Sequence, residues 1–261
     1  MFTYDFDHPE EYVGRFQPIL EPVAREILRE MYEQSSWDSS DSDHRYLTNR
    51  PPSPVTDHVP REIESDFAKC HLRAFHATRL LDQDTIWREG LRALNPNDQI
   101  ERVRKAFSSL PSNEYTERLL TKLATWNEEN DRTGVTTREK LCFVSPHRVG
   151  LHDGGCDIFF KLFGGEFIQR VLGRTVKDTD IPINEPGSPA VVVVKIPATS
   201  CLHGSNKVLW DTMNSLGHSL PETSGSVGDV CIPWGIPPEC IERICDRHDP
   251  YLAAVEPVKA P

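Results

Sequence analysis

Residues 72–94 read Leu-Arg-Ala-Phe-His-Ala-Thr-Arg-Leu-Leu-Asp-Gln-Asp-Thr-Ile-Trp-Arg-Glu-Gly-Leu-Arg-Ala-Leu. The first part predicts a short strand over 71–78, and the second part predicts a helix that closes at Gly90. Side chains two positions apart in a strand share a face, so His76 and Thr78 present an imidazole and a hydroxyl on the same side. The stretch therefore predicts a mixed α and β domain with polar groups at the exit of its first strand.

The composition predicts a soluble globular protein. The chain has 261 residues, of which 38% are hydrophobic and 26% charged, enough for one large domain or two small ones. No apolar run approaches the roughly 20 residues that span a bilayer. The first eight residues are acidic and lack the pattern of a signal peptide, so we expect a cytoplasmic location without membrane contact.

The net charge indicates which macromolecules the chain can bind, and the cysteine pattern indicates whether it holds disulfides or a metal. The net charge of −11 opposes phosphate neutralisation, which makes nucleic acid a less favoured partner than protein, although a local basic patch would change this. Seven cysteines at irregular spacing predict reduced, mostly buried thiols. Cys240, Cys245 and His248 could supply part of a zinc site, but no second pair with matching spacing exists and we expect no metal.

The chain divides into three segments by pattern. Residues 1–34 form a helical segment, in which apolar residues recur every three or four positions from Gln17 to Gln34. We favour packing of this stripe on its own domain over a groove in a partner. Residues 35–66 are rich in Ser, Asp and Pro and predict a linker or long loop. Residues 67–261 carry the mixed domain.

Further elements of that domain follow in order along the chain. The spacing of apolar residues predicts one helix over 98–110, capped by Asp98, and another over 114–127. Residues 158–172 are apolar and aromatic, and Gly164-Gly165 interrupts them. Strands are predicted over 141–145, 190–196 and 229–232, and the β-branched run 190–196 suits a central strand covered on both faces. Pro237-Pro238-Glu239 predicts the start of a final helix.

Two motifs carry a resemblance to a known superfamily. His76-Ala77-Thr78 and the Ile-x-x-x-Gly-Leu helix end that follows resemble the first strand of histidine-type ADP-ribosyltransferases, which usually read His-Gly-Thr. The segment from Asp229, Asp-Val-Cys-Ile-x3-Ile-Pro-Pro-Glu-x-Ile, resembles the end of these domains, where a catalytic glutamate opens a late strand. The resemblance covers residues 70–247. It implies an α+β core of two small facing β-sheets with flanking helices, to which the N-terminal helix is added, and it implies NAD as substrate.

The resemblance also implies roles for individual residues. Cleavage of the nicotinamide bond passes through an oxocarbenium-like state, which a preorganised carboxylate stabilises. His76 would orient the ribose, with Thr78 behind it, and the Ala77 backbone would grip the carboxamide. The remaining positions expected at NAD are the strand residue Phe75, Arg79 and Arg73 at the diphosphate, Phe143, Phe159 or Phe163 as the stacking face, and Ser145 where many relatives carry tyrosine.

Two departures leave the catalytic acid open. Ala77 replaces the usual glycine and adds a Cβ. Asp229 is one methylene shorter than the glutamate whose place it takes. Glu166 follows a double glycine, where the backbone can bend toward a ligand, and is an equally good candidate.

The expected function is therefore an NAD-dependent ADP-ribosyltransferase that modifies a macromolecular acceptor, with protein favoured over nucleic acid. Stand-alone domains of this superfamily are often bacterial toxins or defence effectors, so an antitoxin partner is expected by analogy. One alternative is a catalytically degenerate interaction protein that works through its N-terminal helix and acidic linker. Another is removal of an RNA 2′-phosphate with NAD, which would need several arginines and a basic groove.

Overall fold

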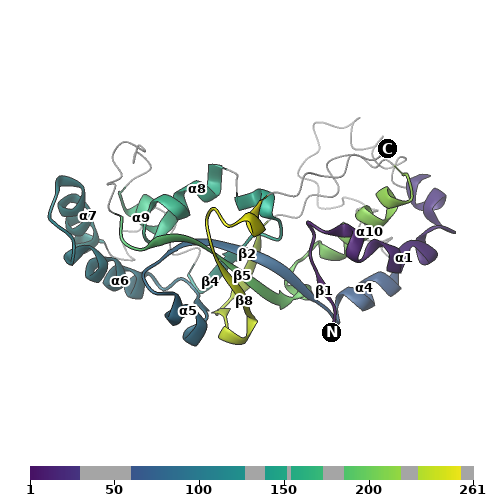
Figure 1. Ribbon diagram of the computed structural model, residues 1–261, viewed down its shortest axis with the longest axis horizontal. Helices are drawn as coiled ribbons and strands as arrows, with labels where there is room; N and C mark the ends of the chain where they lie inside the picture. The colour runs from purple at the N-terminus through teal and green to yellow at the C-terminus, as the bar shows by residue number, and fades with distance from the viewer. Residues whose placement is uncertain (30–59, 127–138, 152–153, 173–184, 219–228, 254–261) are drawn as a thin grey trace, which may run out of the picture. The chain divides into compact units, whose positions relative to one another are not determined.

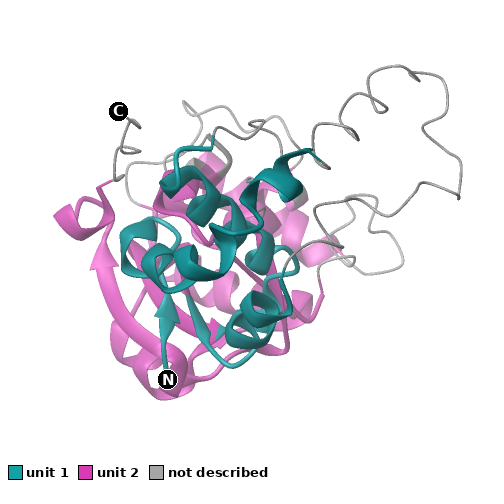
Figure 2. Cartoon of the chain, turned by 90° about the vertical axis from the view of Figure 1, so that its right-hand side faces the viewer, with its two compact units in different colours: residues 1–72, 197–228, 256–261 teal, residues 73–196, 229–255 magenta. Residues whose placement is uncertain are grey.

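A computed structural model describes residues 1–29, 60–126, 139–151, 154–172, 185–218 and 229–253 (Figure 1). The predicted α+β class is confirmed. The chain forms two compact units (Figure 2): unit 1 contains residues 1–72, 197–228 and 256–261, and unit 2 contains 73–196 and 229–255. These units do not follow the division at residues 34 and 66, because unit 1 joins the N-terminal residues to a segment from late in the chain.

Unit 1 is mainly helical. It contains β1 (Thr3–Tyr4), the 3-10 turns η1 (Pro9–Glu11) and η6 (Ala198–Ser200), and the helices α1 (Val13–Leu20), α4 (Arg61–Phe67) and α10 (Gly204–Ser215). Strand β1 pairs in parallel with His71 and Leu72. Helix α1 packs on α10, and aromatic rings of Tyr4, Tyr12 and Phe67 lie within 5.1–5.2 Å of one another in two pairs.

The amphipathic N-terminal helix differs from its prediction in two ways. It begins at Val13, before Gln17, and it is interrupted by a turn over residues 21–23 before helix resumes at residue 24. Pro22 explains the interruption, because proline lacks the N–H that a continuous helix needs. The apolar side chains Phe16, Leu20, Ala24 and Ile27 are buried, and α1 contacts α10 within its own unit. The predicted packing on its own unit is confirmed for α1.

Two tyrosines fix the N-terminal residues within unit 1. The Tyr4 hydroxyl donates to Asp66 Oδ2 at 2.6 Å, and Arg15 donates to the other oxygen of that carboxylate at 2.7 Å. The Tyr12 hydroxyl and the Lys207 ammonium both donate to Asp211. Each buried tyrosine thus meets a carboxylate whose charge a cation balances.

Unit 2 is built around β5 (Ser188–Pro197), which lies between β2 (His71–Leu80) and β8 (Ile241–Asp246). Strands β5 and β8 pair antiparallel, with an irregularity between Val193 and Val194. Residues 190–194 are all buried, which confirms a central strand covered on both faces.

The predicted final helix after Pro237 is wrong. Residues Pro238–Cys240 form only one 3-10 turn, η8, and the chain then continues as β8. A proline at a first turn is a local signal for a helix start, whereas pairing with β5 fixes the following residues as a strand.

Two short antiparallel pairs complete the strands of unit 2. Strand β4 (Leu141–Val144) pairs with β6 (Val230–Pro233), and β3 (Leu91–Arg92) pairs with β7 (Gly235–Ile236). Backbone hydrogen bonds from Lys140 N–H to Leu94 and from Leu94 N–H to Leu141 join the two pairs. The strands predicted at 141–145 and 229–232 are confirmed to within one residue.

The helices of unit 2 are α5 (Gln83–Glu89), α6 (Pro96–Ser108), α7 (Glu114–Thr125), α8 (Gly154–Lys161) and α9 (Gly165–Leu172). The first three lie where the sequence pattern predicts helices. Asn95 caps α6 in place of Asp98, because its side chain accepts from two N–H groups of the first turn. Gly164 and Gly165 both have positive φ and separate α8 from α9. Buried residues of α6, α7 and α9 share one core.

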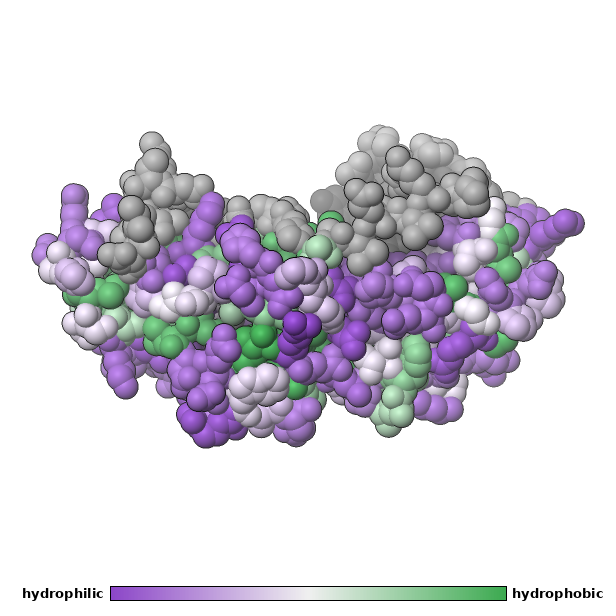
Figure 3. Space-filling model, viewed as in Figure 1, coloured by the Kyte–Doolittle hydropathy of each residue, from purple (hydrophilic) through white to green (hydrophobic). Residues whose placement is uncertain are grey.

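The surface and the thiols agree with the composition. Figure 3 shows hydrophilic residues over most of the visible face, with small apolar areas between them. Within the described residues, every helix falls short of the length and apolar character needed to cross a bilayer. All seven cysteines are reduced thiols, and Cys70, Cys142, Cys201 and Cys245 are buried.

Candidate functional site

His76 lies on β2, and its imidazole has a defined hydrogen-bond partner on β4. Its Nδ1 lies 2.8 Å from the carbonyl oxygen of Phe143 on β4, and since a carbonyl only accepts, Nδ1 carries the proton. Burial lowers the pKa of His76, an effect that the bond to Phe143 only partly opposes, so the ring is neutral at pH 7. In this tautomer Nε2 is a hydrogen-bond acceptor.

Strand register relates the strand of this histidine to Asp229 through β4. Phe75 and Ser145 exchange two backbone hydrogen bonds of 2.8 Å, which joins β2 to β4 at this point. One residue earlier on β4, Val144 lies opposite Val230 of β6. Asp229 directly precedes Val230, so the same register sets it opposite Ser145. Adjacent strands lie about 4.8 Å apart, which separates the backbones of Phe75 and Asp229 by roughly 10 Å.

The faces of β2 separate packing residues from polar ones. Phe75 and Ala77 belong to a buried cluster that includes Phe160, Val191 and other residues of unit 2. His76 and Thr78 alternate with them and lie on the other face, both half-buried, as the spacing predicts. The methyl of Ala77 therefore packs in the core and does not crowd a ligand beside His76.

Three residues expected at NAD have structural roles. The ring of Phe75 is 1% exposed and both of its backbone groups bond to Ser145. Ser145 is itself buried, and its Oγ donates to the carbonyl of His147 at 3.0 Å. Phe163 is buried in the core of α6, α7 and α9. Of the aromatic side chains expected to stack on nicotinamide, Phe143 and Phe159 are only half-buried.

The two candidate acids lie on different parts of unit 2. Glu166 is in the first turn of α9, a helix that packs against α7 and α8. Asp229 is exposed and directly precedes the strand paired with β4. Because it precedes the first residue of β6, the pleat of β6 does not fix the direction of its side chain. Proximity to β4 and β2 thus favours Asp229 over Glu166 as the partner of His76.

The arginines expected at the diphosphate both have protein partners. The Arg79 guanidinium donates to four backbone carbonyls, those of Phe160, Glu185, Pro186 and Gly187, at 2.5–3.0 Å. Arg73 donates to Glu242 at 2.8 Å. Arg79 thus ties β2 to the end of α8 and to the segment that enters β5.

Glu185 is a buried acid that the sequence pattern did not single out. Its carboxylate accepts from the Tyr115 hydroxyl at 2.9 Å and from the Phe163 N–H at 3.0 Å. Burial raises its pKa, and these two hydrogen bonds together with the charge of Arg79 oppose the rise. No motif surrounds Glu185 in the sequence, and its burial follows only from tertiary packing.

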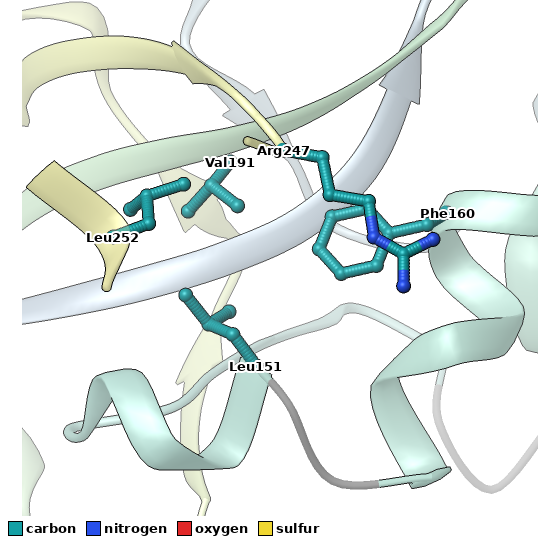
Figure 4. Close-up of a pocket in the computed structure, with 5 residues that line it drawn as sticks. All are labelled: Leu151, Phe160, Val191, Arg247 and Leu252. Carbon is teal, nitrogen blue, oxygen red and sulfur yellow. The ribbon is translucent and has the colours of Figure 1, made fainter. Parts of the chain in front are cut away.

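A small pocket lies on the packing face of β2. Leu151, Phe160, Val191, Arg247 and Leu252 line it, and Figure 4 shows Arg247 extending beside the Phe160 ring, 4.7 Å from its centroid. Its volume of about 10 Å³ holds one water at most, whereas nucleotide-sized sites span several hundred Å³. Four of its lining residues share the cluster of Phe75 and Ala77, so the pocket is a gap in this core and not the site at His76.

The described residues contain no group of three His, Cys, Asp or Glu side chains arranged to hold a metal ion. Neither a scan of protein-family models nor searches of curated proteins and of solved structures finds a match to this chain.

Proposed function

We propose that this chain is an NAD-dependent ADP-ribosyltransferase in which His76 orients the nicotinamide ribose and Asp229 stabilises the cation that forms on it. One observation supports the proposal: the register across β2, β4 and β6 sets the strand that carries His76 two strand spacings from the backbone of Asp229, far downstream in the sequence. The strands also form a four-stranded sheet and two short pairs, β4–β6 and β3–β7, so strands outside the larger sheet are available for a second sheet.

The chemistry follows from the protonation state of each group. A neutral His76 offers Nε2 as an acceptor for a ribose hydroxyl and holds the sugar in one orientation. The bond from the ribose to nicotinamide then breaks, and nicotinamide leaves as a neutral ring with the bonding electrons. The carboxylate of Asp229 stabilises the positive charge left on the sugar. A nucleophile of the acceptor forms the new bond and loses its proton to solvent.

The acceptor in this proposal is a protein, which the net charge of −11 suits better than nucleic acid. A role as a toxin or defence effector with an antitoxin partner remains an analogy with the superfamily. The alternative of an interaction protein receives no support from the N-terminal helix, since Phe16 and Leu20 are buried within unit 1.

The test is release of nicotinamide from NAD, measured by chromatography for the wild type and for single variants. We expect His76→Ala and Asp229→Ala to lower the rate at least about 100-fold, the scale of a lost electrostatic group in an active site. Asp229→Glu should retain activity and Asp229→Asn should not, because only the first keeps the charge. Glu166→Ala should stay within about threefold of the wild type.

The variants must be folded for this comparison, which their melting temperatures will show. A rise of melting temperature with NAD reports binding independently of turnover. Loss of activity in Glu166→Ala with full activity in Asp229→Ala would move the acid to α9. Equal nicotinamide release by all variants would overturn the site.

A further inference from the structure

Trp234 has a solvent-exposed side chain and a strained backbone. It lies between β6 and β7 with 77% of its surface exposed, and its φ of 66° is in the left-handed region, where a bulky side chain is an outlier. The next residue, Gly235, has φ of 93°, and a Cβ there would clash with the carbonyl of Leu91. The chain thus uses glycine at one residue of this turn and tryptophan at the other, where glycine or asparagine would cost less.

Lys140 holds the exposed tryptophan from the neighbouring turn. It is exposed, it also has a left-handed backbone with φ of 63°, and its carbonyl accepts the N–H of Trp234 at 2.8 Å. The ammonium lies 5.5 Å from the centroid of the Trp234 ring. Because the indole is exposed, its burial does not compensate for the strained backbone of this turn. Backbone strain of this kind is concentrated at sites where proteins bind ligands.

The charges nearby indicate the class of partner. On β3, Arg92 lies opposite Gly235, and both Arg88 and Arg92 pair with the single carboxylate of Glu89, which leaves these three residues one positive charge. Lys140 is preceded by Glu139, so these five residues together keep one positive charge on a chain of net charge −11. A small positive charge on an acidic chain is enough to bind a single acidic side chain of a protein. It is too small to neutralise the continuous phosphates of a nucleic acid. Tryptophan is also the residue type most enriched at energetic centres of protein interfaces.

We propose that Trp234 and Lys140 form the docking point for the protein acceptor, which presents an apolar side chain to the indole and an acidic one to the ammonium. This inference rests on the proposed function. Trp234 follows Asp229 by five residues along β6, a span of roughly 17 Å in a strand. A segment docked at the turn can therefore extend along β6 to the sugar.

Fluorescence anisotropy tests the docking point with defined probes: a labelled 12-residue peptide that repeats Asp-Leu-Ser, a matched Lys-Leu-Ser peptide and a 12-nucleotide oligo(dT). We expect the acidic peptide to bind the wild type at least tenfold more tightly than either other probe. Trp234→Asn should weaken this binding at least tenfold, Lys140→Ala should weaken it less, and Trp234→Phe should restore it to within about threefold. Trp87→Ala is the matched control, because it removes a different exposed tryptophan. It should leave the affinity for the acidic peptide unchanged.

Two further readouts separate binding from folding and from chemistry. Because asparagine tolerates the left-handed backbone, Trp234→Asn should melt no lower than the wild type. Its nicotinamide release should stay within twofold, since Trp234 does not touch the sugar. Absent binding of the acidic peptide, unchanged binding by Trp234→Asn, or tighter binding of oligo(dT) would each overturn the docking point. Absent nicotinamide release in the wild type would instead count against the proposed function and leave the anisotropy result valid.

Discussion

His76 is held in its neutral form by burial, and this makes the stability of the fold depend on pH. Its pKa is lowered in the folded chain, whereas in the unfolded chain it is about 6.5. The unfolded state therefore binds more protons below that pH, so the contribution is fully present above about pH 6.5 and is lost as the pH falls toward the lowered value. We expect His76→Asn, which keeps a donor for the Phe143 carbonyl, to reduce the loss of unfolding free energy between pH 7.5 and pH 5.

Urea unfolding at the two pH values measures this difference. The exposed His203→Asn variant is the control and should keep the pH dependence of the wild type. An unchanged pH dependence in His76→Asn would show that the imidazole titrates as freely in the folded chain as in the unfolded one.

The sequence predicts single residues well where one strand decides the outcome. Alternation along β2 is enough to set His76 and Thr78 on one face. It does not reveal that the other face is buried in a core, which gives Phe75 and Ala77 packing roles. The choice between Glu166 and Asp229 depends on the register between β4 and β6, which no local motif contains.

Arg79 is the residue through which three elements of unit 2 are joined. Its guanidinium spans four carbonyls from the end of α8 and from the segment before β5. Hydrogen bonds from a charged group are worth roughly 1.5–3 kcal/mol each, and removal also strands the acceptors, so Arg79→Ala should lower the unfolding free energy by about 3 kcal/mol. Arg79→Lys should lose about half as much, because an ammonium cannot reach all four acceptors from one point.

Urea unfolding at pH 7 measures these losses. Arg73→Ala is the matched control on the same strand, since the ion pair between Arg73 and Glu242 is partly exposed. Such pairs contribute roughly 0–1 kcal/mol. An equal loss for Arg73→Ala and Arg79→Ala would mean that the four carbonyl contacts add nothing to stability.

Helices with a regular spacing of apolar residues were predictable from the sequence. Their exact ends depend on capping side chains and on pairing with distant strands. Helices α6 and α7 follow from the spacing of their apolar residues, but Asn95 and not Asp98 supplies the cap of α6. The helix predicted after Pro237 became β8 because β5 offers an open edge for pairing. Long-range pairing overrides a local start signal, and a single sequence carries no record of which strands will meet.

The division of the whole molecule was the least predictable feature. The composition change over residues 35–66 suggested a boundary there, whereas unit 1 combines α1, which precedes that segment, α4, which begins inside it, and α10 from residues 197–228. The boundaries between the units fall inside strands, after Leu72 in β2 and after Ile196 in β5. Two residues of β2 and one of β5 therefore belong to unit 1, and the rest of each strand belongs to unit 2.

The continuity of β2 and β5 predicts that the chain unfolds in one cooperative step. Tyr12→Phe in unit 1 removes the hydroxyl that donates to Asp211, a hydrogen bond to a charged group worth about 1.5–3 kcal/mol. For a chain of this length each kcal/mol shifts the melting temperature by roughly 2–4 °C, so we expect a fall of about 3–12 °C. Scanning calorimetry should show a single transition that moves as a whole, and Arg79→Ala in unit 2 should move that same transition. Two separate transitions, of which Tyr12→Phe moves one and Arg79→Ala the other, would mean that each unit folds on its own and that the shared strands do not couple them.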